Sequence, residues 1–135
     1  MIIGYTTGVF DLFHVGHLNI LKKASSVCDK LIVGVTTDEF VMKYKNKTPI
    51  INFKDRMEIV NSIKYVDAVV PQDDHNKINA WKKYKFDLMI VGDDWFNTPK
   101  WEKYENEFSK YNVRIIYFPR TENISSTELT QLKKD

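Results

Sequence analysis

The chain has 135 residues, of which 43% are hydrophobic and 13% aromatic, so it is long enough for one globular domain and too short for two. Its 20 Lys and Arg residues and 18 Asp and Glu residues give a net charge of +2, which does not indicate nucleic-acid binding. Because no apolar run approaches the ~18–20 residues of a membrane span, we expect one domain, residues 1–135, with no nucleic-acid or membrane partner.

Hydrophobic periodicity predicts alternating strands and helices. Short apolar or β-branched runs predict strands at residues 2–7, 31–36, 66–70 (closed by Pro71), 88–91 and 113–118. Apolar residues at helical spacing predict helices at 16–27, 53–63, 78–84, 101–111 and 126–133. Residues 43–52 are polar and basic and are expected to form a loop. The alternation predicts an α/β fold with one doubly wound, five-stranded parallel sheet.

Ligands of doubly wound sheets bind beyond the carboxyl ends of the strands. The segments that follow predicted strands and carry unusual residues are 8–17, 37–47, 92–95 and 120–127. We therefore expect the functional residues to come mainly from these four segments.

The first of these segments contains His14-Val15-Gly16-His17 and leads directly into a helix. A helix N-terminus offers free N–H groups and a partial positive charge to a phosphate, and Gly16 leaves room for its approach. His14 and His17 lie on the same side of the first turn, where both imidazoles could donate hydrogen bonds to a phosphate. Such a pair can also be structural or bind zinc, but no Cys or acidic partner has a standard metal-ligand spacing nearby.

This segment resembles the signature of the His-x-Gly-His nucleotidyltransferase superfamily. A second motif, Arg120-Thr121-Glu122-Asn123-Ile124-Ser125-Ser126-Thr127, is similar to the R-T-x-G-I-S-T-T element of the bacterial glycerol-3-phosphate cytidylyltransferases. Asn replaces the usual Gly in it, and Ser one Thr. Gly92-Asp93-Asp94-Trp95 and Thr37-Asp38-Glu39-Phe40 also match that family's patterns. The resemblance runs nearly end to end and implies a Rossmann-like nucleotidyltransferase fold.

The resemblance also implies the site residues. The catalytic residues would be His14, His17 and Arg120. The residues implied to bind CTP are Val9, Phe10, His14, Gly16, His17, Lys47, Asp94, Arg120, Thr121, Ile124, Ser125, Ser126 and Thr127. Lys45 and Lys77 would contact the phosphorylated alcohol, and the residues implied to be structural or orienting are Asp11, Asp38 and Arg56. Mg²⁺ is the expected cofactor, carried mainly by the CTP phosphates, with Asp11 or Asp94 as candidate protein ligands.

Taken without the resemblance, several of these residues have a plainer interpretation. The lysines of residues 43–47 could belong to a solvated loop, and the Ser and Thr residues of the second motif could cap a helix. Asp11 could accept hydrogen bonds from loop or helix N–H groups. Asp38 and Arg56 could form an ordinary salt bridge.

The implied reaction is CMP transfer from CTP to glycerol-3-phosphate, which gives CDP-glycerol and pyrophosphate. A phosphate monoester is largely dianionic near neutral pH, because its second pKa is about 6, so direct in-line attack needs no strong base. The alternatives are a cytidylyltransferase for choline phosphate, ethanolamine phosphate or another polyol phosphate, a related adenylyltransferase, and a non-catalytic nucleotide-binding module. The resemblance further implies a homodimer. Because the single Cys28 cannot form an internal disulfide and only Met1 precedes the first apolar segment, we expect a cytoplasmic protein.

Overall fold

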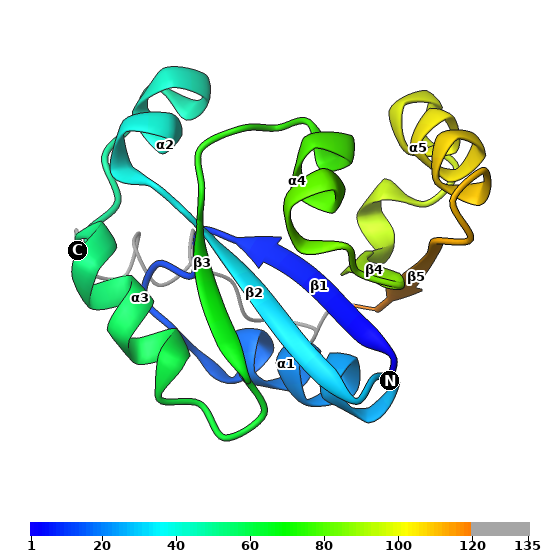
Figure 1. Ribbon diagram of the computed structural model, residues 1–135. Coiled ribbons are helices and arrows are strands. Elements are labelled where there is room, and N and C mark those ends of the chain that lie inside the picture. The colour runs from blue at the N-terminus through cyan, green and yellow to red at the C-terminus, as the bar shows by residue number, and fades with distance from the viewer. Residues whose placement is uncertain (120–135) are drawn as a thin grey trace.

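The computed structural model describes residues 1–119 and contains a sheet of parallel strands (Figure 1). Its five strands lie in the order β3-β2-β1-β4-β5. They are β1 (Ile3–Gly8), β2 (Lys30–Thr36), β3 (Ala68–Gln72), β4 (Leu88–Gly92) and β5 (Arg114–Phe118). Because β1 pairs with β2 on one side and β4 on the other, the chain changes its direction of winding beside β1. The predicted doubly wound parallel sheet is therefore confirmed.

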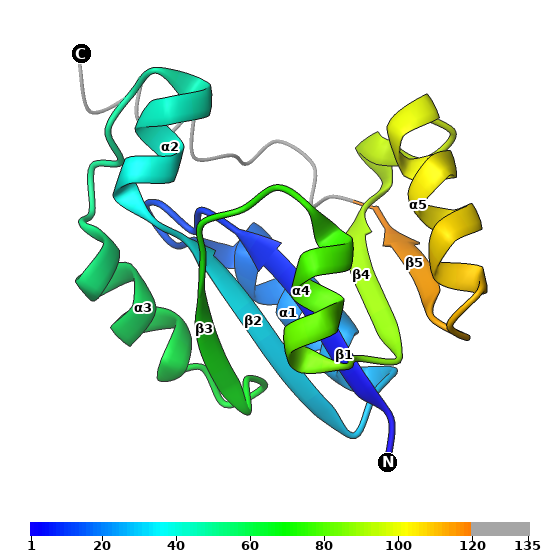
Figure 2. The same cartoon turned by 45° about the horizontal axis from the view of Figure 1, so that its top comes forward.

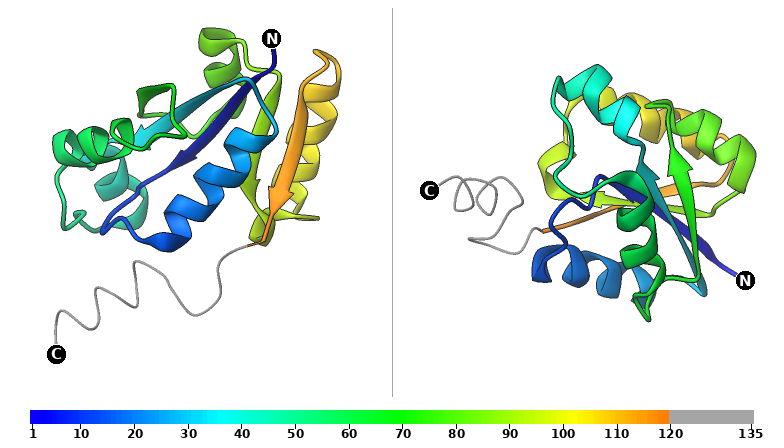
Figure 3. Two further views of the ribbon diagram at one scale, coloured as in Figure 1. Left: turned by 90° about the horizontal axis from the view of Figure 1, so that it is seen from below. Right: turned by 90° about the vertical axis from the view of Figure 1, so that its left-hand side faces the viewer.

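Helices cover both faces of the sheet. They are α1 (Val15–Ser26), α2 (Asp38–Lys45), α3 (Phe53–Asn61), α4 (Lys77–Tyr84) and α5 (Pro99–Ser109), with a short 3₁₀ helix, η1 (Asp93–Trp95). Helices α1 and α3 lie on one face and α4 and α5 on the other (Figure 3). Helix α2 lies beyond the carboxyl ends of β1 and β2 (Figure 2). Within residues 1–119, no helix combines the length and apolar character that crossing a membrane requires.

Each face of the sheet has its own hydrophobic core. Leu21 of α1 and Val60 of α3 pack with Val33 of β2 on one face. Ile78 of α4 and Phe108 of α5 pack on the other face, with side chains from the alternate positions of the same strands. This double burial explains why the strand at residues 31–36 reads as a nearly continuous apolar run.

The sequence prediction was wrong at two places along the carboxyl edge. Residues 43–45 do not begin a loop but form the last turn of α2, which Thr37 caps by accepting a hydrogen bond from the N–H of Phe40 (3.2 Å). Pro71 does not end the third strand, which continues to Gln72. Proline is tolerated there because β3 is an edge strand and has one side without a partner. The helix predicted at 126–133 lies outside the described residues.

Candidate active site

The segment between β1 and α1 lies where the winding of the sheet reverses, which is the usual place for a ligand in this architecture. The backbone turns sharply there, because Phe10 and Leu12 both have positive φ (56° and 49°). The ring of Phe10 folds back over Gly8, where an added Cβ would lie only 3.0 Å from ring carbons. A larger residue at position 8 would therefore require the Phe10 ring to shift by a few tenths of an ångström. The Phe10 side chain is buried beside this turn.

His14 and His17 form a capping box at the N-terminus of α1. His14 is the N-cap residue, and its Nδ1 accepts a hydrogen bond from the backbone N–H of Gly16 (3.0 Å). The Nδ1 of His17 accepts one from the backbone N–H of His14 (3.2 Å). The imidazole rings stack with centroids 3.9 Å apart. The rings of Phe10 and Phe13 pack against the His17 ring, with centroid distances of 5.4 and 5.2 Å. The orientation of the His17 ring is therefore fixed on several sides.

This geometry determines where each imidazole carries its proton. An Nδ1 atom that accepts a hydrogen bond must be unprotonated, so in the neutral rings the proton lies on Nε2. Burial lowers the pKa of His14 and so favours the neutral form at neutral pH. His14, whose lowered pKa favours the neutral form, therefore carries an Nε2–H at the N-terminus of a helix, a position where a phosphate oxygen can be held.

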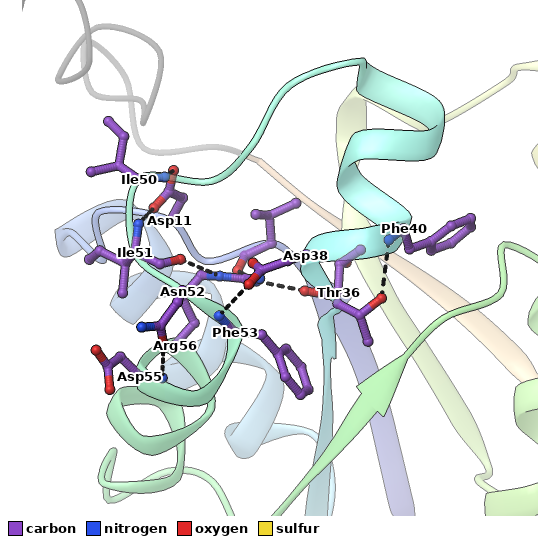
Figure 4. Close-up of polar contacts among 12 residues, drawn as sticks. Asp11, Thr36, Asp38, Phe40, Ile50, Ile51, Asn52, Phe53, Asp55 and Arg56 are labelled. Carbon is purple, nitrogen blue, oxygen red and sulfur yellow. Dashed lines mark hydrogen bonds and ion pairs between the residues drawn. The ribbon is translucent and has the colours of Figure 1, made fainter.

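A buried arginine braces the loops around this turn (Figure 4). Arg56 of α3 is fully buried and donates four hydrogen bonds. Its Nη1 donates to the carbonyls of Val9 (2.8 Å) and Thr36 (2.6 Å), and its Nε to that of Ile51 (2.8 Å). Its Nη2 donates to Asp38 Oδ1 (2.6 Å) in an ion pair that joins α2 to α3. One side chain thus connects the segments that follow β1 and β2.

Asp38 and Asp11 complete this bracing. The second oxygen of Asp38 accepts a hydrogen bond from the N–H of Phe53 (3.0 Å) at the start of α3. The carboxylate of Asp11 accepts from the backbone N–H groups of Ile50 (2.8 Å) and Ile51 (2.9 Å). The structure therefore places all three residues that were expected to orient the site in a single hydrogen-bonded network, and Asp11 has the loop-capping contacts that the sequence left open.

A second buried cation lies on the other face of the sheet. Lys77, the first residue of α4, is only 7% exposed, and its Nζ donates to the Thr7 hydroxyl (3.3 Å) at the end of β1. No carboxylate among residues 1–119 forms an ion pair with it. Burial, and then the positive charge of Lys100, lower the pKa of Lys77 to about 8. The Asp74 carboxylate acts in the opposite direction but does not outweigh the burial. A buried ammonium that forms no ion pair among residues 1–119 is a natural binding point for an anion.

The segment between β3 and α4 contributes an aromatic contact that the sequence analysis did not identify. His75 packs against Phe40 (4.3 Å between ring centroids) and Tyr44 (4.4 Å), both from α2. Burial and the charges of Lys100 and Lys77 lower the pKa of His75. The segment follows a strand, so the rule that indicated the other four segments applies to it equally.

The remaining predicted residues are not all brought together. Val9 and Gly16 lie in the turn and first helical turn beside the histidines. Lys45 ends α2, with its Nζ 5.6 Å from the Tyr44 ring centroid, and Lys47 follows α2; both are exposed. Asp94 is exposed in η1, after β4. The predicted residues from the second motif, Arg120, Thr121, Ile124, Ser125, Ser126 and Thr127, lie outside the described residues.

The described part of the chain has few side chains that could act together as ligands of a metal ion. Residues 1–119 contain no group of three or more His, Cys, Asp or Glu side chains that could hold one. Both oxygens of Asp11 already accept backbone N–H groups, whereas Asp94 is exposed at the carboxyl edge. Mg²⁺ commonly binds through one or two carboxylates together with substrate phosphates, and this donor set fits that mode.

Comparisons with known proteins identify the family. Residues 5–132 match the family model described as cytidylyltransferase-like. The chain is 39% identical to a glycerol-3-phosphate cytidylyltransferase of Bacillus spizizenii over 131 residues, which cover 96% of this chain and 93% of that protein. It is 35% identical to the enzyme of that name from Staphylococcus aureus, with 93% and 90% of the two chains covered.

The similarity in structure agrees with the similarity in sequence. A lipopolysaccharide core biosynthesis protein of Thermoplasma volcanium superposes with a TM-score of 0.77 at 24% identity, covering 90% of this chain and 99% of that one. At this identity the match supports the fold alone, which is the predicted Rossmann-like nucleotidyltransferase fold. On the evidence of the family model and of relatives aligned over nearly their whole length, this chain belongs to the cytidylyltransferase-like family.

Proposed function

We propose that this protein transfers CMP from CTP to glycerol-3-phosphate and so produces CDP-glycerol and pyrophosphate. The observation that carries the proposal is the pair of histidines whose Nδ1 atoms accept backbone N–H groups at the helix N-terminus where the sheet changes direction. The full-length similarity to proteins named glycerol-3-phosphate cytidylyltransferase supports both the nucleotide and the acceptor. The alternative is another phosphorylated alcohol as acceptor, such as choline phosphate, ethanolamine phosphate or another polyol phosphate.

The chemical step is a direct displacement. A phosphate oxygen of glycerol-3-phosphate forms a bond to the α-phosphorus of CTP, and the bond from that phosphorus to the bridging oxygen of the β-phosphate breaks. The bonding electrons leave with pyrophosphate. The attacking phosphate is already largely dianionic at neutral pH, so catalysis depends on positioning and on stabilising negative charge.

The residues divide this work between the two substrates. His14 and His17 donate hydrogen bonds from Nε2 to the α-phosphate as it becomes pentavalent. Arg120 and Lys47 neutralise the pyrophosphate, and the helix start expected at Ser125–Thr127 holds the β- and γ-phosphates. Lys77 and Lys45 bind the phosphate of the acceptor. Within the described residues, Lys77 supports this assignment best, because it is buried at the carboxyl edge without an ion pair.

We also propose Mg²⁺ as the cofactor, brought to the site by the CTP phosphates with Asp94 as a carboxylate ligand. When bound, the ion adds positive charge beside the triphosphate. The role proposed for Asp11 is instead to hold the loop at Ile50 and Ile51, since its carboxylate accepts both of their N–H groups.

Two further elements of the proposal concern the cellular setting. The free Cys28 is compatible with a reducing compartment, so we place the reaction in the cytoplasm. We expect the enzyme to work as a homodimer, as the family resemblance implies. Sedimentation equilibrium at several protein concentrations measures the assembly directly.

Pyrophosphate release measured with Mg²⁺ tests the activity. CTP, ATP, UTP and GTP are each combined with glycerol-3-phosphate, choline phosphate and ethanolamine phosphate. Fast release only with CTP and glycerol-3-phosphate is the expected result. Release with CTP and another ester would keep the mechanism and replace the acceptor. A folded protein that binds CTP but releases no pyrophosphate with any ester would be a nucleotide-binding module, contrary to the proposal.

The substitution His14→Asn separates catalysis from helix capping. Asn is a good N-cap residue and can accept the N–H of Gly16, but it has no group that replaces the outward Nε2–H. We expect kcat to fall by about 10²–10³ or more, which is typical for the loss of one such donor, while thermal stability changes little. His14→Ala is the comparison, because it removes both the donor and the cap. Equal activity in His14→Asn and the unmodified protein would show that the imidazole does not act on the α-phosphate.

A further inference from the structure

Gln72, the last residue of β3, has an unpaired polar atom in a buried position. The side chain is 8% exposed, and its Oε1 has no hydrogen-bond partner in the part of the chain that the structure describes. The backbone of the residue is well placed by contrast, because its carbonyl accepts the N–H of Thr37 (3.1 Å) at the start of α2. A buried acceptor without a donor costs free energy, and such groups in native proteins usually have a role that explains them.

The alternation of β3 shows to which face this side chain belongs. Ala68 and Val70 pack against the core beneath α4, whereas Val69 packs against the opposite core. Gln72 lies two residues after Val70 and therefore leaves the sheet on the α4 face. By the same alternation, Thr7 lies on this face, two residues after Tyr5 of the same core.

The unpaired acceptor thus shares a face and an edge with the unpaired cation. Lys77 reaches Thr7 at the end of β1, and two strand spacings of about 4.8 Å separate β1 from β3. The short connection from Gln72 to Lys77 also contains His75, which packs against α2. Among residues 1–119, the ammonium of Lys77 forms no ion pair and the Oε1 of Gln72 accepts no hydrogen bond, so a donor and an acceptor are available at one end of one face.

A phosphorylated polyol supplies both missing partners, an anionic phosphate and a hydroxyl that can donate. We propose that Gln72 is a specificity-determining residue for the acceptor substrate, whose Oε1 accepts a hydrogen bond from a hydroxyl of the phosphorylated polyol. This inference rests on the proposed function and adds to it how the acceptor is selected. An ester such as choline phosphate, which has no hydroxyl to donate, leaves the acceptor unpaired.

The test compares substrates that differ by one hydroxyl. The value of kcat/KM for pyrophosphate release with CTP is measured with glycerol-3-phosphate and with its two single-deoxy analogues, the phosphates of propane-1,2-diol and propane-1,3-diol. We expect the unmodified protein to prefer glycerol-3-phosphate over at least one analogue by about tenfold to a hundredfold, the effect of one buried hydrogen bond. In Gln72→Met, which keeps the length of the side chain and removes the acceptor, that preference should disappear, because glycerol-3-phosphate and the analogue that keeps the recognised hydroxyl lose rate while the analogue without it does not.

Thermal unfolding and two further variants separate recognition from structure. Because Gln72→Met removes an unpaired buried acceptor, the melting temperature without ligands should stay the same or rise. Gln72→Glu keeps an acceptor oxygen and should keep the preference, and Asp73→Asn, an exposed neighbouring change, should alter neither property.

Several results would overturn the inference. An equal loss of kcat/KM with all three esters, or a lower melting temperature in Gln72→Met, would assign Gln72 a structural role. If the preference survives in Gln72→Met, another group binds the hydroxyl of the substrate, or Gln72 Oε1 accepts a hydrogen bond only from water. In each of these cases CTP-dependent release persists, so the proposed function stands. Absence of release with every ester would instead refute the proposed function, and the inference with it.

Discussion

Within residues 1–119, Arg56 and Lys77 are both buried at the carboxyl edge of the sheet, and their polar contacts differ. Arg56, on the α3 face, donates to three carbonyl groups and forms an ion pair with Asp38. Lys77, on the α4 face, has one contact of 3.3 Å to the hydroxyl of Thr7 and no ion pair among residues 1–119. Both are less than a tenth exposed, so burial alone does not distinguish them.

This difference in hydrogen bonding distinguishes a residue that supports the fold from one that can bind a ligand. A buried charge whose hydrogen bonds are satisfied within the chain fixes loops in place and has little left to offer a ligand. A buried charge without a partner lowers stability and gains a partner only when an anion binds. On this comparison we propose that the Arg56 network supports the loops around the active site, and that Lys77 and Gln72 contact the bound substrate.

The largest effect should come from breaking the satisfied network. Arg56→Met removes the cation and leaves Asp38 and three carbonyl groups without their donor, and loss of one partner of a buried pair typically costs about 3–5 kcal/mol. We expect the free energy of unfolding, measured by urea denaturation, to fall by that amount. Arg56→Lys keeps the charge but loses the planar fork, so it should lie in between. A loss in Arg56→Met that is no larger than in Arg56→Lys would mean that the charge contributes nothing and that only the planar fork of donors matters.

The second prediction has the opposite sign. Lys77→Met removes a buried ammonium that forms no ion pair among the described residues, so at pH 7 the variant should be more stable than the unmodified protein, although pyrophosphate release falls. The pKa of Lys77 is lowered from 10.5 to about 8. At about 1.4 kcal/mol per pKa unit, the charged form of Lys77 is destabilised in the folded protein by about 3 kcal/mol.

The pH dependence of stability tests independently whether Lys77→Met is more stable than the unmodified protein. Between about pH 8 and pH 10.5 the unfolded chain holds more protons at Lys77 than the folded protein, so the unmodified protein becomes more stable as pH rises through this window. The advantage of Lys77→Met should therefore be complete below about pH 8 and shrink toward pH 10.5. Urea denaturation at a series of pH values measures it. A variant that is less stable at pH 7 would show that Lys77 supports the fold.

The same contrast explains how far the sequence could predict the molecule. The Rossmann-like sheet and the histidine pair depend on local patterns: apolar runs for the strands, and a Gly between two His residues at a helix start. Such patterns are visible without knowing which segments meet in space. The resemblance to the cytidylyltransferases, confirmed by the family model, added residue roles that local patterns do not contain.

The rest depends on contacts between distant segments. That Arg56 reaches Val9, 47 positions away, and that Lys77 reaches Thr7, 70 positions away, follows only from the order of the strands. The lysines at the end of α2 were assigned to a loop because their exposed positions carry no apolar pattern, although Thr37 is a good N-cap residue. The sequence does not single out Gln72, because its position on the face that also holds Lys77 follows only from the arrangement of the sheet.

The smallest of these effects tests whether the scaffold acts as one unit. Asp11 accepts two backbone N–H groups, from Ile50 and Ile51, and the carbonyl of Ile51 accepts the Nε of Arg56. Asp11→Asn keeps one acceptor and loses the charge, so it should reduce the free energy of unfolding by about 1–2 kcal/mol. Because the two side chains hold the same loop, the loss in the double variant with Arg56→Lys should be smaller than the sum of the single losses. Additive losses in urea denaturation would mean that Asp11 and Arg56 act separately. In a different outcome, Asp11→Asn would leave stability unchanged and raise the Mg²⁺ concentration needed for half-maximal activity. Asp11 would then be a metal ligand rather than a residue that supports the loop.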